Sequence, residues 1–218
     1  MSVVRDIQVR AIQSGLANAF VKKHHYSGKV APNSQLHFGA FLGGRLHGVM
    51  SFGASLDKAK IQGLVKNTGW NEFIELNRMA FDDTLPKNNE SRCLGVAIRL
   101  IKKYAPHVKW IVSFADGTQC GDGTIYRASN FVLTKIGKNT TIGYSEKLGE
   151  VVAKHGTRSA IQGRVRLLDG FQLRYIYFID KKKQGDLTVP ILPYSAIDDF
   201  SAGMYKGKRI SLAERKES

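Results

Sequence analysis

The sequence predicts an α/β protein in the broad sense, with a mixed sheet flanked by helices. The hydrophobic pattern gives the order helix, hairpin, strand, helix, strand, helix, strand, strand. With 218 residues, 43% of them hydrophobic, the chain is long enough to bury one sizeable core. We therefore expect a single domain over residues 1–180, followed by a basic extension over residues 181–218.

The first half of the chain predicts one helix and three strands. Residues 12–24 place Leu16, Ala17, Phe20 and Val21 on one helical face. Two runs rich in β-formers, 35–42 and 45–51, flank Gly43-Gly44, a dipeptide typical of a tight hairpin. The stretch 73–81 (FIELNRMAF) alternates as a further strand, which Asp82-Asp83 and Pro86 end.

The second half alternates helices with strands. Residues 95–104 have an apolar helical face, with Lys102 and Lys103 near the C-terminus, where cations are favoured. The near-continuous apolar run 109–115 predicts a strand covered on both faces. A short helix at 124–129 and strands at 131–136 and 173–180 complete the pattern. The polar segment 138–166 predicts no definite element, and beyond Pro190 we expect an irregular arm.

The charge balance indicates a polyanionic partner. Lys and Arg number 33 against 18 Asp and Glu, a formal net charge of +15. The cations are spread along the chain, including Arg158, the run 181–183 and the tail from Lys206 to Lys216. A distributed basic surface suits a nucleic-acid backbone. A merely soluble basic protein, or a tail that touches anionic lipid, is the alternative.

Nothing in the sequence predicts a membrane span or a secretory signal, so we expect action in the cytoplasm. The two cysteines, Cys93 and Cys120, lack metal-type spacing and are expected to be reduced thiols.

The residues around the start of the predicted helix at 95–104 suggest an anion site. Ser91-Arg92-Cys93-Leu94-Gly95-Val96-Ala97 follows a strand and leads into the helix. Free N–H groups at a helix start attract phosphates, and Gly95 and Ala97 would let them approach the backbone. Such a loop is weakly specific, because small residues are common near helix starts.

Two motifs resemble the GCN5-related N-acetyltransferase superfamily. Arg92-x-x-Gly95-x-Ala97 matches its pyrophosphate loop, and Tyr126 to Phe131 (YRASNF) matches its Tyr-x-x-x-Gly-Phe landmark, with Asn130 in place of Gly. Asn tolerates the left-handed backbone that Gly usually supplies there. The resemblance implies a mixed, mostly antiparallel central sheet and an acetyl-CoA or related acyl-CoA donor. Its binding residues would be Ser91, Arg92, Gly95, Val96 and Ala97, and Tyr126 would protonate the departing thiolate.

A narrower resemblance covers about half of the chain, from Lys22 to Phe131. The strings LHFGAF, SFGASLDK, WNEFIELNRMAFDD, NNESR and SFADGTQCGDGTIYRASNF are similar to those of the Mom family of Mu-like phages. Membership implies conversion of the N6 amino group of adenine in double-stranded DNA to a carbamoylmethyl form, which protects phage DNA from host restriction. It also implies a phage- or prophage-encoded protein acting in a bacterial cell.

That chemistry requires an extruded base and an acid or base beside the amine. Glu75, Asp116 and Asp122 are the candidate carboxylates. We favour Asp116, at the end of the SFAD strand, as the group that orients or deprotonates N6; the structural alternative is an Asp that caps the following turn. Arg78 would contact phosphate or hold an acidic partner.

The string 22–28 (KKHHYSG) combines cations with aromatic rings at the end of the first helix. We expect Lys22, Lys23, His25 and Lys29 to contact DNA and Tyr26 to belong to the catalytic site, where an aromatic surface could stack a flipped base. The family's link to iron raises His25 as a metal ligand. Adjacent histidines on a helix diverge, so His37 or His47 would have to join it.

Three other functions are alternatives to the one that the Mom family implies. An adenine methyltransferase would need an Asp/Asn-Pro-Pro-aromatic motif, and the chain contains no Pro-Pro pair. A non-catalytic DNA-binding protein could retain the same scaffold, and an N-acetyltransferase acting on another amine would share the donor loop. An acetyl group transferred whole would give N6-acetyladenine, so simple acyl transfer is not the complete reaction that the Mom family implies. A homodimer is also left open.

Overall fold

The computed structural model describes residues 6–86, 88–118, 121–140, 142–153, 162–168, 170–199, 204–205 and 208–209. Cys120, Arg158 and most of the basic tail from Lys206 to Lys216 lie outside these residues. The chain forms two compact units. The first comprises Met1–Phe114, Ile125–Val132 and Tyr175–Ile191, and the second comprises Ala115–Thr124, Leu133–Arg174 and Leu192–Ser218. The predicted boundary at residue 180 stays a prediction.

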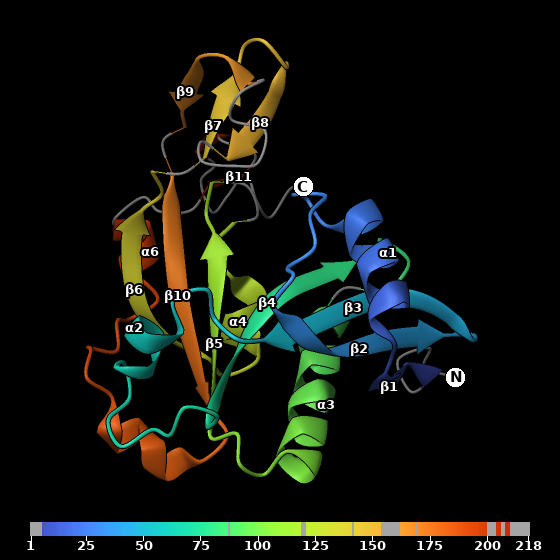
Figure 1. Ribbon diagram of the computed structural model, residues 1–218, viewed down its shortest axis with the longest axis vertical. Helices are drawn as coiled ribbons and strands as arrows, with labels where there is room; N and C mark the ends of the chain where they lie inside the picture. Colours follow the sequence, from blue (N-terminus) through green and yellow to red (C-terminus); the bar gives the residue numbers. More distant parts are fainter. Residues whose placement is uncertain are drawn as a thin grey trace. The chain divides into compact units, whose positions relative to one another are not determined.

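A seven-stranded sheet has the order β1-β2-β3-β4-β5-β10-β6. Its strands are β1 (Gln8–Ala11), β2 (Ser34–Leu42), β3 (Arg45–Gly53), β4 (Phe73–Phe81), β5 (Trp110–Asp116), β10 (Phe171–Phe178) and β6 (Val132–Lys138). The pairs from β1 to β4 are antiparallel, and β4 pairs with β5 in parallel (Figure 1). The prediction of a mixed, mostly antiparallel sheet is confirmed. The edge strand β1 was not predicted.

Two sequence signals shape the hairpin and the first helix. Gly43 and Gly44 both have positive φ, 56° and 77°, as the tight turn between β2 and β3 requires. Helix α1 (Ser14–His24) contacts β2, β3 and β4, and Figure 1 shows it crossing these strands. Its buried residues Ala17 and Val21 pack against Val49 of β3.

A buried cluster of the first unit surrounds the start of β4 and β5. Trp110 is fully buried and stacks on Phe73, with ring centroids 4.7 Å apart. Its indole N–H donates to Thr68 Oγ1 at 3.2 Å. A short helix that was not predicted, α2 (Lys58–Gln62), brings Ile61 into this cluster. The two strands are thereby held together at the end where they pair.

Helix α3 (Asn89–Tyr104) begins six residues earlier than the predicted start at residue 95. Asn88 precedes it in the left-handed conformation, with φ 69°. The buried face includes Cys93, Leu94, Ala97, Ile98 and Ile101, so the apolar periodicity already starts within the segment interpreted as a loop. The prediction of a loop over 91–97 is wrong.

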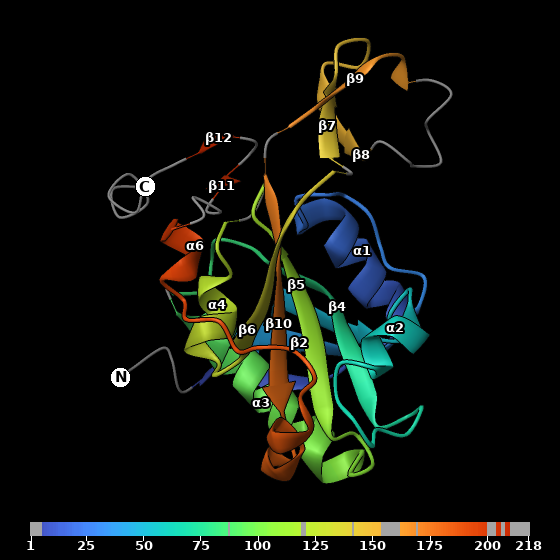
Figure 2. The ribbon, with the colours of Figure 1, turned by 90° about the vertical axis from the view of Figure 1, so that its left-hand side faces the viewer.

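The second unit contains elements that the sequence did not predict. The segment without a predicted element forms a separate three-stranded sheet of β7 (Ile142–Ser145), β8 (Glu150–Ala153) and β9 (Val165–Leu167), shown in Figure 2. Beyond Pro190 lie α6 (Ala196–Asp199) and the pair β11 (Met204–Tyr205) and β12 (Lys208–Arg209). The remaining elements are α4 (Thr124–Ala128) and the 3₁₀ helix η2 (Lys181–Asp186). Within the described residues, no helix has the length and apolarity to cross a bilayer.

Candidate functional site

Strands β4 and β5 stop pairing halfway along β4. Their parallel register runs from Phe73 opposite Trp110 to Leu76 opposite Ser113, whose hydroxyl donates to the Leu76 carbonyl at 3.3 Å. Beyond Leu76, β4 continues to pair with β3 up to Phe81. Beyond Leu76, the backbone N–H and C=O groups of β4 that point toward β5 therefore make no strand-to-strand hydrogen bonds in the described part of the chain. A ligand in extended conformation could bind along this edge.

A β-bulge at the same point turns two charged side chains of β4 to one face. Arg78 lies opposite Ser51 and Glu75 lies opposite Gly53, with a register shift between them. Ser51 and Gly53 are two residues apart and share a face of β3. Because cross-strand partners share a face, Glu75 and Arg78 also share one although they are three residues apart.

The bulge residue Asn77 is buried and held on both sides. Its Nδ2 donates to the Ala54 carbonyl at 3.2 Å, and its Oδ1 accepts from Ser34 Oγ at 3.0 Å. Asn33 Nδ2 donates to the same Ala54 carbonyl. A Cβ on Gly53 would come within 2.0 Å of the Asn33 carbonyl oxygen, so this close approach requires glycine. The bulge is thus fixed by hydrogen bonds and close packing.

Glu75 lies in a partly apolar environment. Burial raises the pKa of its carboxyl group above the usual value, while Ser55, Asn77 and the charge of Arg78 oppose the shift. The Ser55 hydroxyl is buried and lowers the pKa of the Glu75 carboxyl group, so the two groups are close. Within the described residues, the Ser55 hydroxyl makes no hydrogen bond of normal geometry. A carboxylate that is more basic than usual suits proton abstraction.

Arg78 connects β4 to the segment after α1. Its Nε donates to the Lys29 carbonyl at 2.9 Å, and its Nη1 donates to the Asn77 carbonyl at 2.6 Å. The Lys29 N–H donates in turn to Ser27 Oγ at 3.3 Å. Arg78 therefore positions residues 25–29 through their backbone. Its predicted contact with phosphate or an acidic partner stays a prediction.

His25 is held in one tautomer. The Ser27 N–H donates to His25 Nδ1 at 3.1 Å, and Ser27 Oγ lies 2.8 Å from the same nitrogen. Burial, and then the charge of Arg78, lower the pKa of His25 to about 4. The ring is therefore neutral at pH 7, with its proton on Nε2. In this state His25 can donate a hydrogen bond but does not act as a base.

Tyr26 extends this arrangement to solvent. Its ring packs on His25 with centroids 4.2 Å apart, and 51% of the residue is exposed. We call Glu75, Asn77, Arg78, His25, Tyr26, Ser27 and Ser55 the β4 cluster. It combines a basic carboxylate, a neutral donor and an exposed aromatic face, which together could hold and deprotonate a planar amine.

The residues do not fit an iron site. His25 Nδ1 is occupied by Ser27, and its Nε2 carries the proton, so neither nitrogen is available to a metal in this state. His37 Nδ1 lies 2.8 Å from Ser51 Oγ, and His47 Nδ1 lies 3.0 Å from Asp82. The part of the chain that is described contains no group of three His, Cys, Asp or Glu that could hold a metal ion.

The predicted cofactor-binding residues lie on α3. Gly95, Val96 and Ala97 are well inside the helix, where their N–H groups donate to carbonyls four residues earlier, so a main-chain cradle at these three residues is wrong. The free N–H groups belong to the first turn, near Glu90 and Ser91. Arg92 follows directly after them and is exposed. A role for Ser91 and Arg92 in donor binding stays a prediction.

The second unit holds Asp116 in a turn. Its Oδ1 accepts from the Thr118 N–H and from Asn139 Nδ2, both at 3.0 Å. Burial raises the pKa of Asp116, and these hydrogen bonds oppose the shift. The Asp122 carboxylate caps α4 by accepting from the Thr124 N–H at 3.0 Å. These contacts are those expected of an Asp that caps the following turn. The catalytic role of Asp116 stays a prediction.

Tyr126 is 8% exposed and packs against Phe131 and Tyr175. Asn130 has φ 61°, so it does adopt the left-handed conformation expected of the residue that replaces glycine.

Lys22 and Lys23 are exposed in the last turn of α1, and Lys29 is exposed after it. Their contacts with DNA, and the role of Tyr126, stay predictions.

Three members of the β4 cluster, Ser27, Ser55 and Asn77, were not predicted. Asn is depleted in strands, so Asn77 within FIELNRMAF is the kind of residue that can mark a bulge. Ser27 and Ser55 give no such signal, because serine is common in loops of any function.

The chain is similar to proteins of a known family. The model of the Mom protein family matches residues 6–196. Methylcarbamoylase mom of Escherichia phage Mu is 32% identical over 197 residues, which cover 86% of this chain and 81% of the phage protein.

Solved acetyltransferases share the fold. The Arabidopsis thaliana protein NAA60, in complex with a bisubstrate analogue, matches with a TM-score of 0.53 at 10% identity, over 79% of this chain and 97% of that one. An IAA acetyltransferase from Bacillus cereus matches with a TM-score of 0.50 at 13% identity, over 79% of this chain and 99% of the other.

Proposed function

This chain belongs to the Mom protein family, and on that premise we propose that it is a transferase that modifies the N6 amino group of adenine in double-stranded DNA. The observation that supports the proposal is the β4 cluster, in which Arg78 links Glu75, a carboxylate of raised pKa, to the segment that carries His25 and the exposed Tyr26. The formal net charge of +15 supports a DNA substrate. We propose that the protein acts in the bacterial host cell.

The acceptor base would leave the duplex and stack on Tyr26, because chemistry at N6 requires an unpaired adenine. The neutral His25 would donate from Nε2 to an acceptor atom of the base or of the transferred group. Arg78 would keep both residues in place through Lys29 and Ser27. Lys22, Lys23 and Lys29 would contact the DNA backbone.

Proton transfer would fall to Glu75. The N6 nitrogen forms a bond to carbon of the donor, the donor's bond to its leaving group breaks, and the N6 proton passes to the Glu75 carboxylate. We keep Asp116 as a candidate catalytic carboxylate. Tyr126 would return a proton to the leaving thiolate.

The donor would be an acyl-CoA. Its extended arm would pair with the free edge of β4 beyond Leu76, and its phosphates would contact Ser91, Arg92 and the free amides at the start of α3. An acetyl group transferred whole gives N6-acetyladenine. The carbamoylmethyl product, and with it protection from restriction, therefore requires a further step or a related donor.

The test is mass spectrometry of nucleosides from DNA of cells that express the protein, with cells carrying the empty vector as control. We expect a heavier deoxyadenosine, with hydrogen replaced by a carbamoylmethyl group. An acetyl increment would instead support simple acetyl transfer to DNA. Unchanged deoxyadenosine at good expression would overturn the proposal and favour a DNA-binding protein or an acetyltransferase for another amine.

A further inference from the structure

We propose that the three-stranded sheet of β7, β8 and β9 is a DNA-binding surface, which holds the backbone of double-stranded DNA along its β9 edge. This inference rests on the proposed function, because it assigns a contact surface for the same substrate. The sheet is separate from the seven-stranded sheet. The two acetyltransferases above are matched over at least 97% of their length but cover 79% of this chain, so a substantial part of the chain lies outside that likeness.

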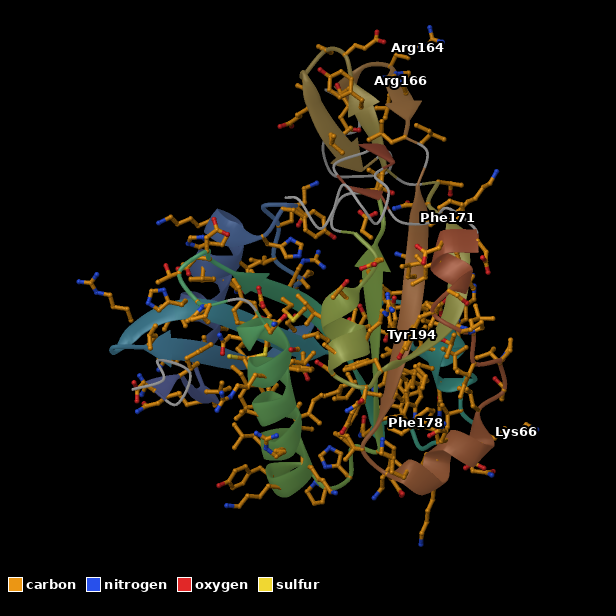
Figure 3. All side chains as sticks on the ribbon, turned by 180° about the vertical axis from the view of Figure 1, so that it is seen from behind. Lys66, Arg164, Arg166, Phe171, Phe178 and Tyr194 are labelled. Carbon is orange, nitrogen blue, oxygen red and sulfur yellow. The ribbon has the colours of Figure 1, made fainter. Side chains whose placement is uncertain are left out.

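The edge strand β9 carries two exposed arginines. The strand order β8-β7-β9 places β9 at an edge, and Arg166 lies within it, two residues after Arg164. Both side chains are exposed, and Figure 3 shows them projecting from this sheet. Guanidinium groups and the free backbone N–H groups of an edge strand are both suited to phosphate oxygens.

An aromatic residue lies beside Arg166. Tyr144 of β7 is opposite Arg166 on one side and Val151 of β8 on the other, so the three side chains share a face. Val151 is 37% exposed, and Tyr144 is half-buried. A cation next to an aromatic ring suits contact with a phosphate and the adjoining sugar or base.

The arrangement of β9 on β7 is tight. A Cβ on Gly143 would come within 2.5 Å of Val165 Cγ1 and 2.6 Å of the Arg166 carbonyl oxygen. The buried Ser145 Oγ donates to the Gln162 carbonyl at 2.6 Å, which ties the segment before Arg164 to β7. The backbone that carries the two arginines is therefore held against β7 before DNA binds.

The sheet carries charges of both signs. Its described acidic residues, Glu146 and Glu150, lie in the turn between β7 and β8 and at the start of β8, together with Lys147. The described residues of the β9 segment, 162–168, include Arg164 and Arg166 and no acid. The two acids lie at the same end of the sheet as Arg164, because Ser145 pairs with both Glu150 and Val165, whereas Arg166 lies one row further along, opposite Tyr144. Arginines can also protect an edge strand from aggregation, and the experiment separates the two roles.

The experiment measures how DNA affinity depends on salt. We expect the variant Arg164→Gln/Arg166→Gln to bind a DNA duplex about tenfold or more weakly at 0.1 M salt, and to lower the slope of log K against log salt by about 2. The matched control is Lys102→Gln/Lys103→Gln, which removes the same charge from exposed positions of α3. Its slope should change by less than half as much.

An unchanged slope in the arginine variant, or an equal loss in both variants, would overturn the proposal, because the second result indicates diffuse charge. Tyr144→Phe should bind like the wild type and Tyr144→Leu more weakly, since only phenylalanine keeps the ring. If the wild-type protein neither binds nor modifies DNA, the proposed function fails. If the wild type modifies DNA and the arginine variant binds with an unchanged slope, only this surface fails.

Discussion

The Glu75→Gln variant is expected to modify DNA at least about 100-fold more slowly than the wild type, because glutamine cannot take up the N6 proton. Glutamine has the same shape and can still contact Ser55 and Asn77, so the fold should be kept. The measurement is the initial rate of adenine modification on purified DNA with saturating donor. Far-ultraviolet circular dichroism would show that the variant is folded.

The rate of adenine modification should also depend on pH. Burial raises the pKa of Glu75, and only its ionised form accepts a proton, so wild-type activity should fall as the pH falls through that raised pKa. The Glu75→Gln variant should lose this acidic limb. Glu72→Gln is the matched control, since the Glu72 carboxylate accepts from the Gly69 N–H at 2.8 Å and is not part of the β4 cluster. A Glu75→Gln rate within threefold of the wild type would remove Glu75 from the mechanism.

The Trp110→Ala variant is expected to lower the free energy of unfolding by about 3–5 kcal/mol. Trp110 is fully buried, stacks on Phe73 and donates to Thr68 Oγ1, so its removal leaves a cavity and breaks this hydrogen bond. The cavity would lie where β4 and β5 pair, next to the point at which the two strands separate.

Urea unfolding of the wild type and the variant measures this loss. Trp70→Ala is the matched control, because Trp70 is 53% exposed and its ring contacts Lys58, whose Nζ lies 4.6 Å from the centroid. That control should cost less than about 1 kcal/mol. Equal losses for the two tryptophans would contradict the described packing.

Local patterns in the sequence predicted most of the seven-stranded sheet. The alternation in FIELNRMAF gave β4 at the observed bounds, and Gly43-Gly44 gave the hairpin. The start of α3 was missed because the small residues from Ser91 to Ala97 are typical of a loop. In the structure these residues are helical, and Cys93 and Leu94 are buried on the inner face of the helix. The β7–β9 sheet was missed because its strands are three or four residues long, too short for a periodic signal.

The candidate site was predicted in its residue types more than in its geometry. Glu75, Arg78, His25 and Tyr26 were all candidates, and the structure brings them together in one unit. What joins them is the bulge at Asn77 and the hydrogen bond from Arg78 to Lys29, which depend on contacts between residues far apart in the sequence. Periodicity carries no information about either contact.

The most direct test of the β4 cluster as the acceptor site is photocrosslinking of the protein to duplex DNA that contains a photoreactive adenine analogue, followed by mass mapping of the adducts. We predict adducts in the peptide that contains His25 and Tyr26, and their loss in Tyr26→Ala. Efficient crosslinking confined to peptides outside the β4 cluster would contradict the account.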